Sequence, residues 1–423
     1  MVLAPRCVQI IITRIIILCV TSYINLDMNL AEIRYINYDI LSSRLILLNF
    51  WLIILMIFSQ IAGKLISSLL ALFCILNLSL VCSFLVERVL LFYFFFEWAL
   101  IPIFLIIMGW GYQLERLKAR MYLLFYTLFA SLPLLIVILI QLNSLFNSSM
   151  GYLPIICNFL IFDRLSLLIV IGAFLVKFPM FFVHQWLPKA HVEAPVSGSI
   201  ILAGILLKLG GYGIIRMGYI FRAAEIVSFV ISIALVGGAI LGIVCVSNSD
   251  IKVIIAYSSV VHIALPIMGV LSLTSWGIER AAMIIVAHGI CSSGMFSCAN
   301  IMYERTHSRR IMRNKGSLNY SPRMAIIWFL LCIANLGGPF TLNLLSEVIL
   351  IVNTGFVSIP LLLAVGGISF FSAAYSLILY SRVYQGSFFN SSFSLRFLTV
   401  RESMVLTSHI WPIFLIPLSS NIL

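Results

Sequence analysis

The sequence predicts an all-α protein that crosses a membrane many times, and composition and patterning support this class. Of the 423 residues, 62% are hydrophobic and only 9% are charged, and the mean hydropathy is +1.15. A soluble domain is about half apolar and a quarter charged. The apolar residues form long runs without strand alternation, and lipid offers the backbone no water for hydrogen bonding. Helices are therefore the expected spanning form.

We expect about thirteen transmembrane helices, with no connection long enough to hold a soluble domain. The predicted spans lie near residues 8–24, 44–62, 65–86, 89–109, 121–142, 164–183, 195–215, 225–247, 251–273, 278–303, 324–352, 357–384 and 404–421. The first run has no small-residue cleavage site and precedes many further spans, so we do not expect a removable signal.

The spans divide into four predicted parts, 1–64, 65–215, 225–384 and 385–423. The second and third parts hold five helices each, and the fourth helix of each is interrupted by proline, at Pro179 and Pro339. An interior proline removes a backbone donor and breaks or kinks a helix. Because five is odd, the second group enters the membrane inverted, and matched breaks in two inverted repeats are typical of transporters. Coincidence is the alternative, since proline is common in membrane helices.

The net charge of +12 is concentrated on one side of the predicted bundle. With loops assigned alternately to two sides, about 16 of the 26 Lys and Arg fall on one side and about 7 on the other. The richer side carries Arg116, Lys118, Arg120, Arg305, Arg309, Arg310, Arg313, Lys315 and Arg323. The excess therefore indicates topology and a basic surface for anionic lipids, cardiolipin included, and no nucleic-acid partner.

Among the ionisable residues inside predicted spans, six are the candidate functional residues: Glu97, Lys177, Lys208, His262, His288 and Glu347. A lysine at the bilayer centre costs roughly 2.5–3.5 kcal/mol, so such groups should face inward, paired or solvated. Each has a structural alternative. The lysines could reach the surface, Glu97 could stay neutral, the histidines could be core residues, and Glu347 could cap a helix end.

A polar stretch from His184 to Pro195 separates the spans that carry the two lysines. We expect a hinge at the membrane surface, shaped by residues such as Lys189 and Glu193, with His191 as an alternative site of proton uptake. The nine cysteines form no C-x-x-C pair and suit apolar packing, so we expect no metal site.

The embedded residues together predict a proton relay. Burial disfavours a charged side chain and an opposite charge favours it. We expect Lys177 to stay protonated beside Glu97 and to pass its proton to Lys208 when the pair separates. The two histidines would then carry the proton to Glu347. We find no nucleotide or iron–sulfur motif, so the driving force must come from a partner or an ion gradient.

The run VKFPMFFVHQWLPKAHVEAPVSGSIILAGILLKLGGYG resembles the antiporter-like subunits of respiratory NADH:ubiquinone oxidoreductase, complex I. The stretches FFFEWALIP, SDIKVIIAYSSVVHIALPIMG, IVAHGICSSG and ANLGGPFTLNLLSE extend the resemblance over most of residues 88–350. The pairing of GWGYQLERL with YERTHSRR favours one of the mitochondrial pumping subunits over its sisters.

The resemblance implies inverted five-helix repeats and a role for each candidate. Glu97 and Lys177 match the family's carboxylate–lysine pair, and Lys208 matches the central lysine. The positions of His262 and His288 match relay histidines, and that of Glu347 the acidic exit residue.

The resemblance also implies the surroundings of the chain. The expected location is the mitochondrial inner membrane, beside other complex I subunits, especially antiporter-like ones. Flavin mononucleotide, iron–sulfur clusters and ubiquinone are expected in those partners, and no cofactor on this chain. Residues 1–45, with Arg14 in an apolar run, depart from the family and leave the N-terminal topology open. The alternative functions are a sodium/proton antiporter subunit and an inert membrane scaffold.

Overall fold

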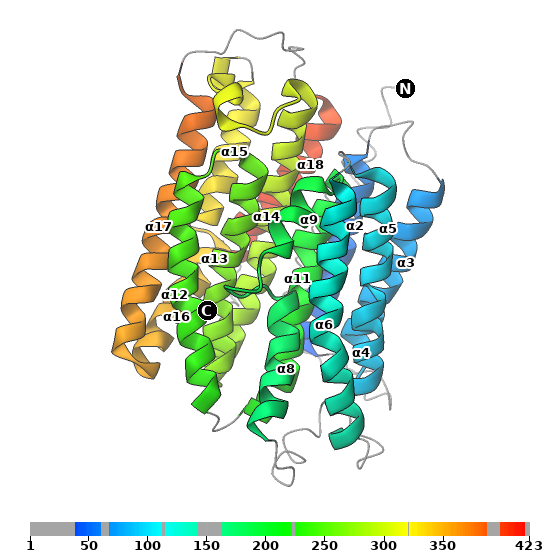
Figure 1. Ribbon diagram of the computed structural model, residues 1–423. Coiled ribbons are helices and arrows are strands. Elements are labelled where there is room, and N and C mark those ends of the chain that lie inside the picture. Colours follow the sequence, from blue (N-terminus) through cyan, green and yellow to red (C-terminus); the bar gives the residue numbers. More distant parts are fainter. Residues whose placement is uncertain are drawn as a thin grey trace.

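The protein is a bundle of long helices that run side by side (Figure 1). A computed structural model describes residues 39–60, 67–111, 115–142, 150, 163–221, 225–319, 321–386 and 398–418. The predicted span at 8–24 and Arg14 lie outside these residues.

Helices of the first half follow the predicted spans closely. They are α2 (Ile40–Ser59), α3 (Ser67–Leu85), α4 (Val89–Trp98), α5 (Leu100–Trp110), α6 (Arg116–Leu142), α8 (Arg164–Lys177), α9 (Trp186–Glu193), α10 (Val196–Ile201), the π-helical turn η2 (Leu202–Leu206), α11 (Leu207–Met217) and the 3₁₀ turn η3 (Gly218–Phe221).

Helices of the second half do the same, except where 324–352 divides in two. They are α12 (Glu225–Ser247), α13 (Ile251–Leu271), α14 (Ser275–Thr306), the 3₁₀ turns η4 (Ile311–Asn314) and η5 (Ser317–Asn319), α15 (Pro322–Asn335), α16 (Leu342–Val357), α17 (Ile359–Tyr384), α18 (Val400–Leu415) and η6 (Ile416–Leu418).

Nine helices in the described part of the chain are long and apolar enough to cross a membrane. The prediction of an almost entirely helical, polytopic membrane protein is therefore confirmed at this level. Helices α8, α15, α16 and α18 are shorter, with 14, 14, 16 and 16 residues. The total of thirteen spans, the inverted repeats and the four-part division remain predictions.

Both spans predicted to be interrupted, at Pro179 and Pro339, are broken, whereas Pro133 and Pro266 lie inside the continuous helices α6 and α13. Helix α8 ends at Lys177, and Phe182 in the following connection has a φ of 75°. Helix α15 ends at Asn335, and Phe340 in its connection has a φ of 62°. A bulky residue with positive φ is rare. Both connections therefore hold a tight backbone turn that a continuous helix could not contain.

The predicted surface hinge at 184–195 is wrong. Most of it forms helix α9, in which His191 and Glu193 are buried at 0% and 3% exposure. Helix α9 packs against α6 and α13. His184, His191 and Glu193 are buried against other helices, whereas Gln185 and Lys189 are exposed. The sequence pattern could not distinguish this arrangement from a surface loop.

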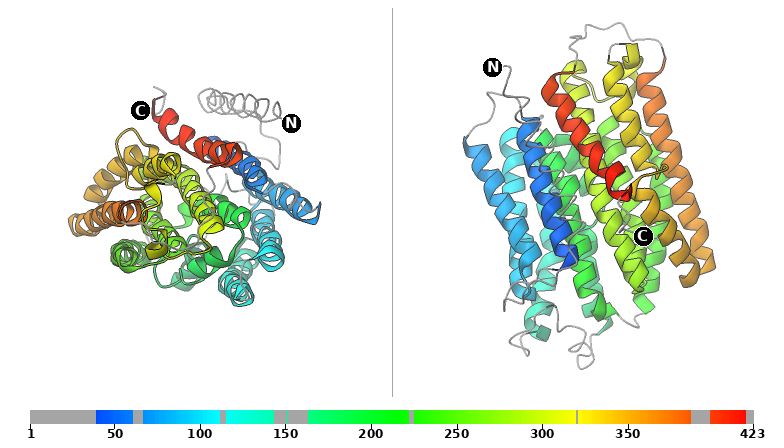
Figure 2. Two further views of the ribbon diagram at one scale, coloured as in Figure 1. Left: turned by 90° about the horizontal axis from the view of Figure 1, so that it is seen from above. Right: turned by 180° about the vertical axis from the view of Figure 1, so that it is seen from behind.

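The most deeply buried long helices carry Lys208, His262 and His288. The most apolar stretches of α14, of α10 to α11 and of α13 are 100%, 94% and 89% buried, against 28% for α6 and α17. Helix α14 contacts α13, α16, α10 and α2, and α18 crosses behind the bundle against α14 and α2 (Figure 2). The lysines and histidines on these central helices therefore face protein.

The two basic segments lie at the same end of the molecule. Arg116 donates to the Gly111 carbonyl, which is close to Glu193, and Glu193 pairs with Arg309 at 3.5 Å. The second segment, 305–315, follows α14 at that end (Figure 1). The two basic segments that the sequence assigned to one side therefore lie at one end of the folded bundle.

Candidate functional site

Glu97 and Lys177 form a buried ion pair. Lys177 is the last residue of α8, and its Nζ lies 2.9 Å from Glu97 Oε1 on α4. The same Nζ donates to the Phe96 carbonyl at 2.6 Å and lies 3.1 Å from the centre of the Phe96 ring. The two side chains are only 5% and 16% exposed. A carboxylate, a carbonyl and an aromatic face together compensate the buried ammonium.

Lys208 lies immediately after the π-helical turn η2. Its Nζ donates to the Ala203 carbonyl at 2.6 Å and lies 3.1 Å from Nδ1 of His288 on α14. A π turn holds one more residue than an α turn and is frequent at functional sites, because it redirects the side chains that follow. With 1% exposure, Lys208 cannot reach the surface. The structure excludes the surface-reaching alternative for this residue.

Close helix packing brings Lys208 and His288 together. Gly204 of η2 faces Gly289 of α14, and a Cβ built on Gly289 would lie 2.9 Å from the Gly204 carbonyl oxygen. Glycine at both positions lets the two backbones approach. The lysine on one helix is thereby within hydrogen-bond distance of the histidine on the other.

The two histidines continue the row toward Glu347. The rings of His288 and His262 have centroids 5.5 Å apart. His262 Nδ1 lies 3.5 Å from Glu347 Oε1 on α16, and its Nε2 lies 2.9 Å from the Tyr375 hydroxyl on α17. Lys208, His288, His262 and Glu347 thus form a continuous sequence of buried ionisable groups from four helices.

Glu347 lies against the connection between the two parts of the second broken helix. Gly337 has a φ of 73°, and a Cβ there would lie 2.5 Å from Glu347 Oε2. The Thr341 hydroxyl accepts from the Leu344 N–H at 3.4 Å and caps α16. Asn343 donates to the Ala334 carbonyl at 2.7 Å and so fixes the start of α16 to the end of α15. The break between α15 and α16 therefore positions the carboxyl group.

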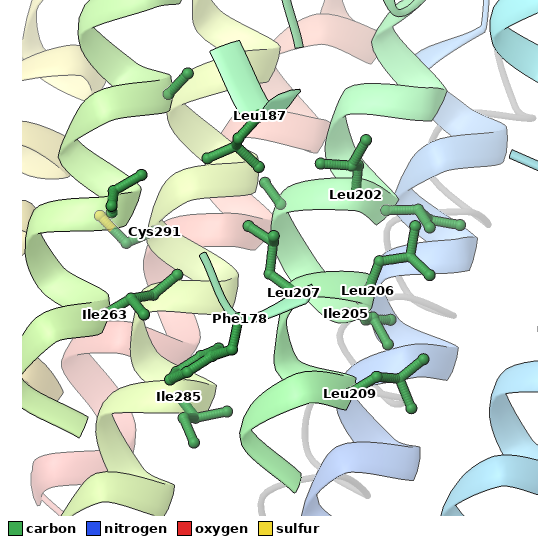
Figure 3. Packing of buried hydrophobic residues seen from close by; sticks show 14 of the residues in the cluster. Phe178, Leu187, Leu202, Ile205, Leu206, Leu207, Leu209, Ile263, Ile285 and Cys291 are labelled. Carbon is green, nitrogen blue, oxygen red and sulfur yellow. The ribbon is translucent and has the colours of Figure 1, made fainter. Parts of the chain in front are cut away.

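An apolar contact joins the end of α8, where Lys177 lies, to α11, the helix that carries Lys208. Phe178, which follows Lys177, packs on Gly210 and Gly211 of α11 and lies beside Ile285 (Figure 3). No hydrogen bond or ion pair joins the two lysines within the described ranges. The structure thus brings four of the six predicted residues into one row and pairs the other two nearby.

Several buried polar atoms near this row have no hydrogen-bond partner among the described residues. They include Nε2 of His288, both ring nitrogens of His191 and Oγ of Ser197. His191 is stacked on Phe296 with ring centroids 4.3 Å apart. Buried polar groups of this kind ordinarily bind internal water.

Sequence reasoning missed two buried residues of this region, Tyr375 and Lys252. Both were hidden in apolar runs, Tyr375 in SAAYSLILY and Lys252 as the second residue of a predicted span. Lys252 is 2% exposed and lies at the basic end of α13. Both could have been identified as polar side chains within predicted spans, which is how the six candidate functional residues were identified.

Comparison with known proteins places this arrangement in a family. The transmembrane family described as NADH:quinone oxidoreductase/Mrp antiporter matches residues 86–372. The chain belongs to this family. The family segment contains all six candidate residues, the broken helices at Lys177 and Asn335, and the π turn before Lys208.

Relatives in the family carry a common name. The chain is 41% identical to a NADH-ubiquinone oxidoreductase chain 4 from Ceratitis capitata, over 97% of this chain and 92% of the relative. It is 46% identical to chain 4 from Aedes aegypti, over 78% and 74%. These relatives confirm the resemblance to complex I and the preference, from GWGYQLERL and YERTHSRR, for subunit 4 over its sister subunits.

Solved structures share the fold. A chain of respiratory complex I from Thermus thermophilus superimposes with a TM-score of 0.80 at 24% identity, covering 91% of this chain and 82% of that one. A chain of the Mrp complex from Dietzia sp. superimposes with a TM-score of 0.76 at 17% identity, covering 85% and 69%. The helical arrangement is thus that of antiporter-like membrane proteins.

Proposed function

We propose that the chain is a proton-translocating subunit of the membrane arm of NADH:ubiquinone oxidoreductase, acting where its chain 4 relatives act. The observation that carries the proposal is the buried row Lys208–His288–His262–Glu347. The chain itself contributes no redox chemistry in this proposal. Flavin mononucleotide, iron–sulfur clusters and ubiquinone belong to partner subunits, and the complex lies in the mitochondrial inner membrane.

The row can move a proton in short steps. Lys208 Nζ is within hydrogen-bond distance of His288 Nδ1, so a proton can pass from the ammonium to the imidazole. Internal water near His288 Nε2 would carry a proton toward His262, whose Nδ1 faces the Glu347 carboxylate. Histidine suits these steps because it accepts and releases protons near neutral pH.

The Glu97–Lys177 pair controls this row through its charge. The sequence suggested direct proton transfer from Lys177 to Lys208, but Phe178 and the glycines of α11 form an apolar contact beside these residues. When Glu97 separates from Lys177, the uncompensated ammonium repels a second ammonium on Lys208 and favours transfer to His288. Reforming the pair restores a protonated Lys208.

Uptake occurs at the basic end in this proposal. His191 is buried, its ring nitrogens suit bound water, and α9 ends at Glu193 beside Arg309. Exposed Arg310 and Arg313 at the same end would attract anionic lipids, cardiolipin included. Thirteen spans, ten of them in two inverted five-helix repeats with breaks after Lys177 and Asn335, complete the proposed architecture.

The test is replacement of Lys208 by methionine in the assembled complex within sealed vesicles. Lys208→Met should abolish proton translocation through this subunit, because no other lysine Nζ in the described residues contacts His288. Lys189→Met is the matched control, since Lys189 is exposed and its Nζ lies over the Tyr122 ring at 3.4 Å, away from the row. Equal proton-to-electron ratios for both variants would contradict the proposal.

A sodium/proton antiporter subunit is the second candidate, because the description of the matching family also names the Mrp antiporter. The same helices and buried charges would then move protons driven by an ion gradient, and not by quinone reduction. Proton flux into vesicles that requires sodium and proceeds without NADH would support this candidate. Flux that requires NADH and quinone, and is independent of sodium, would support the first.

A further inference from the structure

Helices α13 and α16 run side by side in the same direction, away from the basic end. Helix α13 begins at that end, since the N–H of its first residue, Ile251, donates to the Arg309 carbonyl at 3.0 Å. Its contacts with α16 advance in step along both helices, and in chain order they are His262–Glu347, Gly269–Leu350 and Ser272–Asn353. The last two contacts therefore lie beyond Glu347, toward the opposite end of the molecule.

A hydrogen-bonded polar cluster forms the last of these contacts. The Asn353 side chain donates to Ser272 Oγ at 2.8 Å and accepts from Thr274 Oγ1 at 2.9 Å. Leu273 has a φ of 54°, and this turn brings the hydroxyls on either side of it to one amide. Asn353 is 5% exposed, whereas Ser272 and Thr274 are partly exposed and precede the exposed Trp276. The cluster thus connects the buried face of α16 to the surface.

Leu350 lies between Glu347 and this cluster on α16. It is 0% exposed, and a Cβ built on Gly269 would lie 2.6 Å from its Cδ2. A Cβ on Gly277 of α14 would lie 2.5 Å from the Gly269 carbonyl oxygen and 2.7 Å from Asn353 Nδ2. Leu350 therefore packs on bare backbone where α13 and α14 meet, next to the cluster.

We propose that the proton leaves Glu347 past Leu350, which acts as an apolar gate between the row and the cluster of Asn353, Ser272 and Thr274. The inference rests on the proposed function of the row. Glu347 and Asn353 are about 9 Å apart along the axis of α16. A chain of about three hydrogen-bonded water molecules spans such a distance.

Release through this gate balances protons and charge. Glu347, once protonated by the imidazolium of His262, gives its proton to water and becomes a carboxylate again. The proton moves along the water chain past Leu350 to the partly exposed hydroxyls and enters the bulk solution. When the apolar layer is dry, a proton cannot return, because it moves only along hydrogen-bonded groups and apolar constrictions close by losing water.

Leu350→Thr and Leu350→Val form a matched pair that tests whether wetting of this layer sets the barrier. Threonine and valine have nearly the same shape, and both shorten the leucine, so the loss of packing is similar. Only threonine offers a hydroxyl that water can bind. Leu350→Thr should therefore admit water between Glu347 and Asn353, whereas Leu350→Val should stay drier.

The experiment measures proton back-flow in the assembled complex in sealed vesicles. Proton-to-electron ratios are determined during NADH oxidation, with and without an opposing pH gradient, and the difference gives the back-flow. Back-flow should be about fivefold greater for Leu350→Thr than for Leu350→Val, the effect of one added hydrogen bond to the water chain. Equal back-flow in the two variants would overturn the inference. A purely structural defect would instead lower electron transfer and the ratio without a gradient.

Leu80→Thr is the control for position. Leu80 is also 0% exposed and lies on α3, whose main contacts are α2, α4 and α5. The same hydroxyl is thereby introduced away from α13 and α16 and should give no back-flow. Back-flow as large as that of Leu350→Thr would overturn the assignment of the gate.

Asn353→Leu tests the outer side of the gate and does not depend on assembly of the Leu350 variants. It extends the apolar layer toward the surface and should slow NADH-driven translocation several-fold. Asn49→Leu is its control, because Asn49 is 0% exposed and donates to Asn77 Oδ1 at 2.8 Å, between α2 and α3. Equal translocation by the two variants would overturn the role of the cluster.

Lys208→Met separates this inference from the function on which it rests. If Lys208→Met abolishes translocation while Leu350→Thr and Leu350→Val behave alike, the gate is wrong and the relay stands. If Lys208→Met leaves translocation intact, the proposed function fails and the gate fails with it.

Discussion

At the scale of single residues, the buried charges of Lys177 and Glu97 compensate each other. Lys177→Met leaves Glu97 buried with no cation at 2.9 Å. Breaking a buried pair from one side typically costs about 3–5 kcal/mol, because a charge is left uncompensated. We therefore expect Lys177→Met to lower the thermal stability of the assembled complex and to stop proton translocation.

Its control is the double variant Glu97→Gln/Lys177→Met, which removes both charges and should recover much of the stability without restoring translocation. Thermal inactivation of both variants measures the difference.

The exposed pair Arg164–Glu225, with side chains 84% and 87% exposed, provides a second comparison. Glu225→Gln should have no measurable effect, since surface pairs contribute little. If Glu97→Gln/Lys177→Met were as unstable as Lys177→Met, the expected coupling between Glu97 and Lys177 would be contradicted.

The six candidate residues could be identified from the sequence because each lies well inside an apolar run, whereas the missed Lys252 is the second residue of its predicted span. Their partners could not be predicted, because a contact such as that between His262 and Tyr375 joins residues 113 positions apart. Tyrosine in an apolar run also resembles ordinary core packing. The sequence therefore indicated which ionisable residues are buried. The order in which they contact one another could be determined only from the structure.

At the scale of helices, η2 and α14 approach each other closely beside Lys208. Gly289→Ala would place a Cβ 2.9 Å from the Gly204 carbonyl oxygen, and a backbone atom cannot move aside as a flexible side chain can. Overpacking of this kind typically costs about 1–3 kcal/mol. We expect η2 to shift away from α14, the contact between Lys208 and His288 to lengthen, and translocation to fall.

Gly366→Ala on α17 is the matched control, because a Cβ there meets no atom within 4 Å. Thermal inactivation and proton-to-electron ratios should match those of the unaltered complex. A structure of Gly289→Ala with unchanged spacing between η2 and α14 would show that the glycine contact does not set the position of Lys208.

The breaks in α8 and between α15 and α16 could be predicted because proline acts on its own helix. The π turn at Leu202–Leu206 and helix α9 could not. Both depend on neighbours, α14 for the π turn and α6 and α13 for α9. A polar stretch such as 184–195 reads as a surface loop until the helices that surround it are known.

At the scale of the whole molecule, the basic residues specify an orientation. Arg116 and Arg309 lie at one end, connected through Gly111 and Glu193. Lys and Arg accumulate on the cytoplasmic or matrix side of membrane proteins. The sequence predicted this asymmetry correctly because it depends only on the order of spans and loops, which an error of a few residues at helix ends does not alter.

Orientation can be measured by cysteine labelling at opposite ends of α14. This helix has 32 residues, a length of about 48 Å. Arg313 is exposed beyond its basic end, and Trp276 is 69% exposed at the other. In inverted inner-membrane vesicles, a membrane-impermeant thiol reagent should label Arg313→Cys and leave Trp276→Cys unlabelled. In right-side-out vesicles the pattern should reverse, because the basic end faces the matrix in the proposed orientation. The unaltered complex gives the background from native cysteines, and labelling of Trp276→Cys from the matrix side would contradict the orientation on which the direction of proton movement depends.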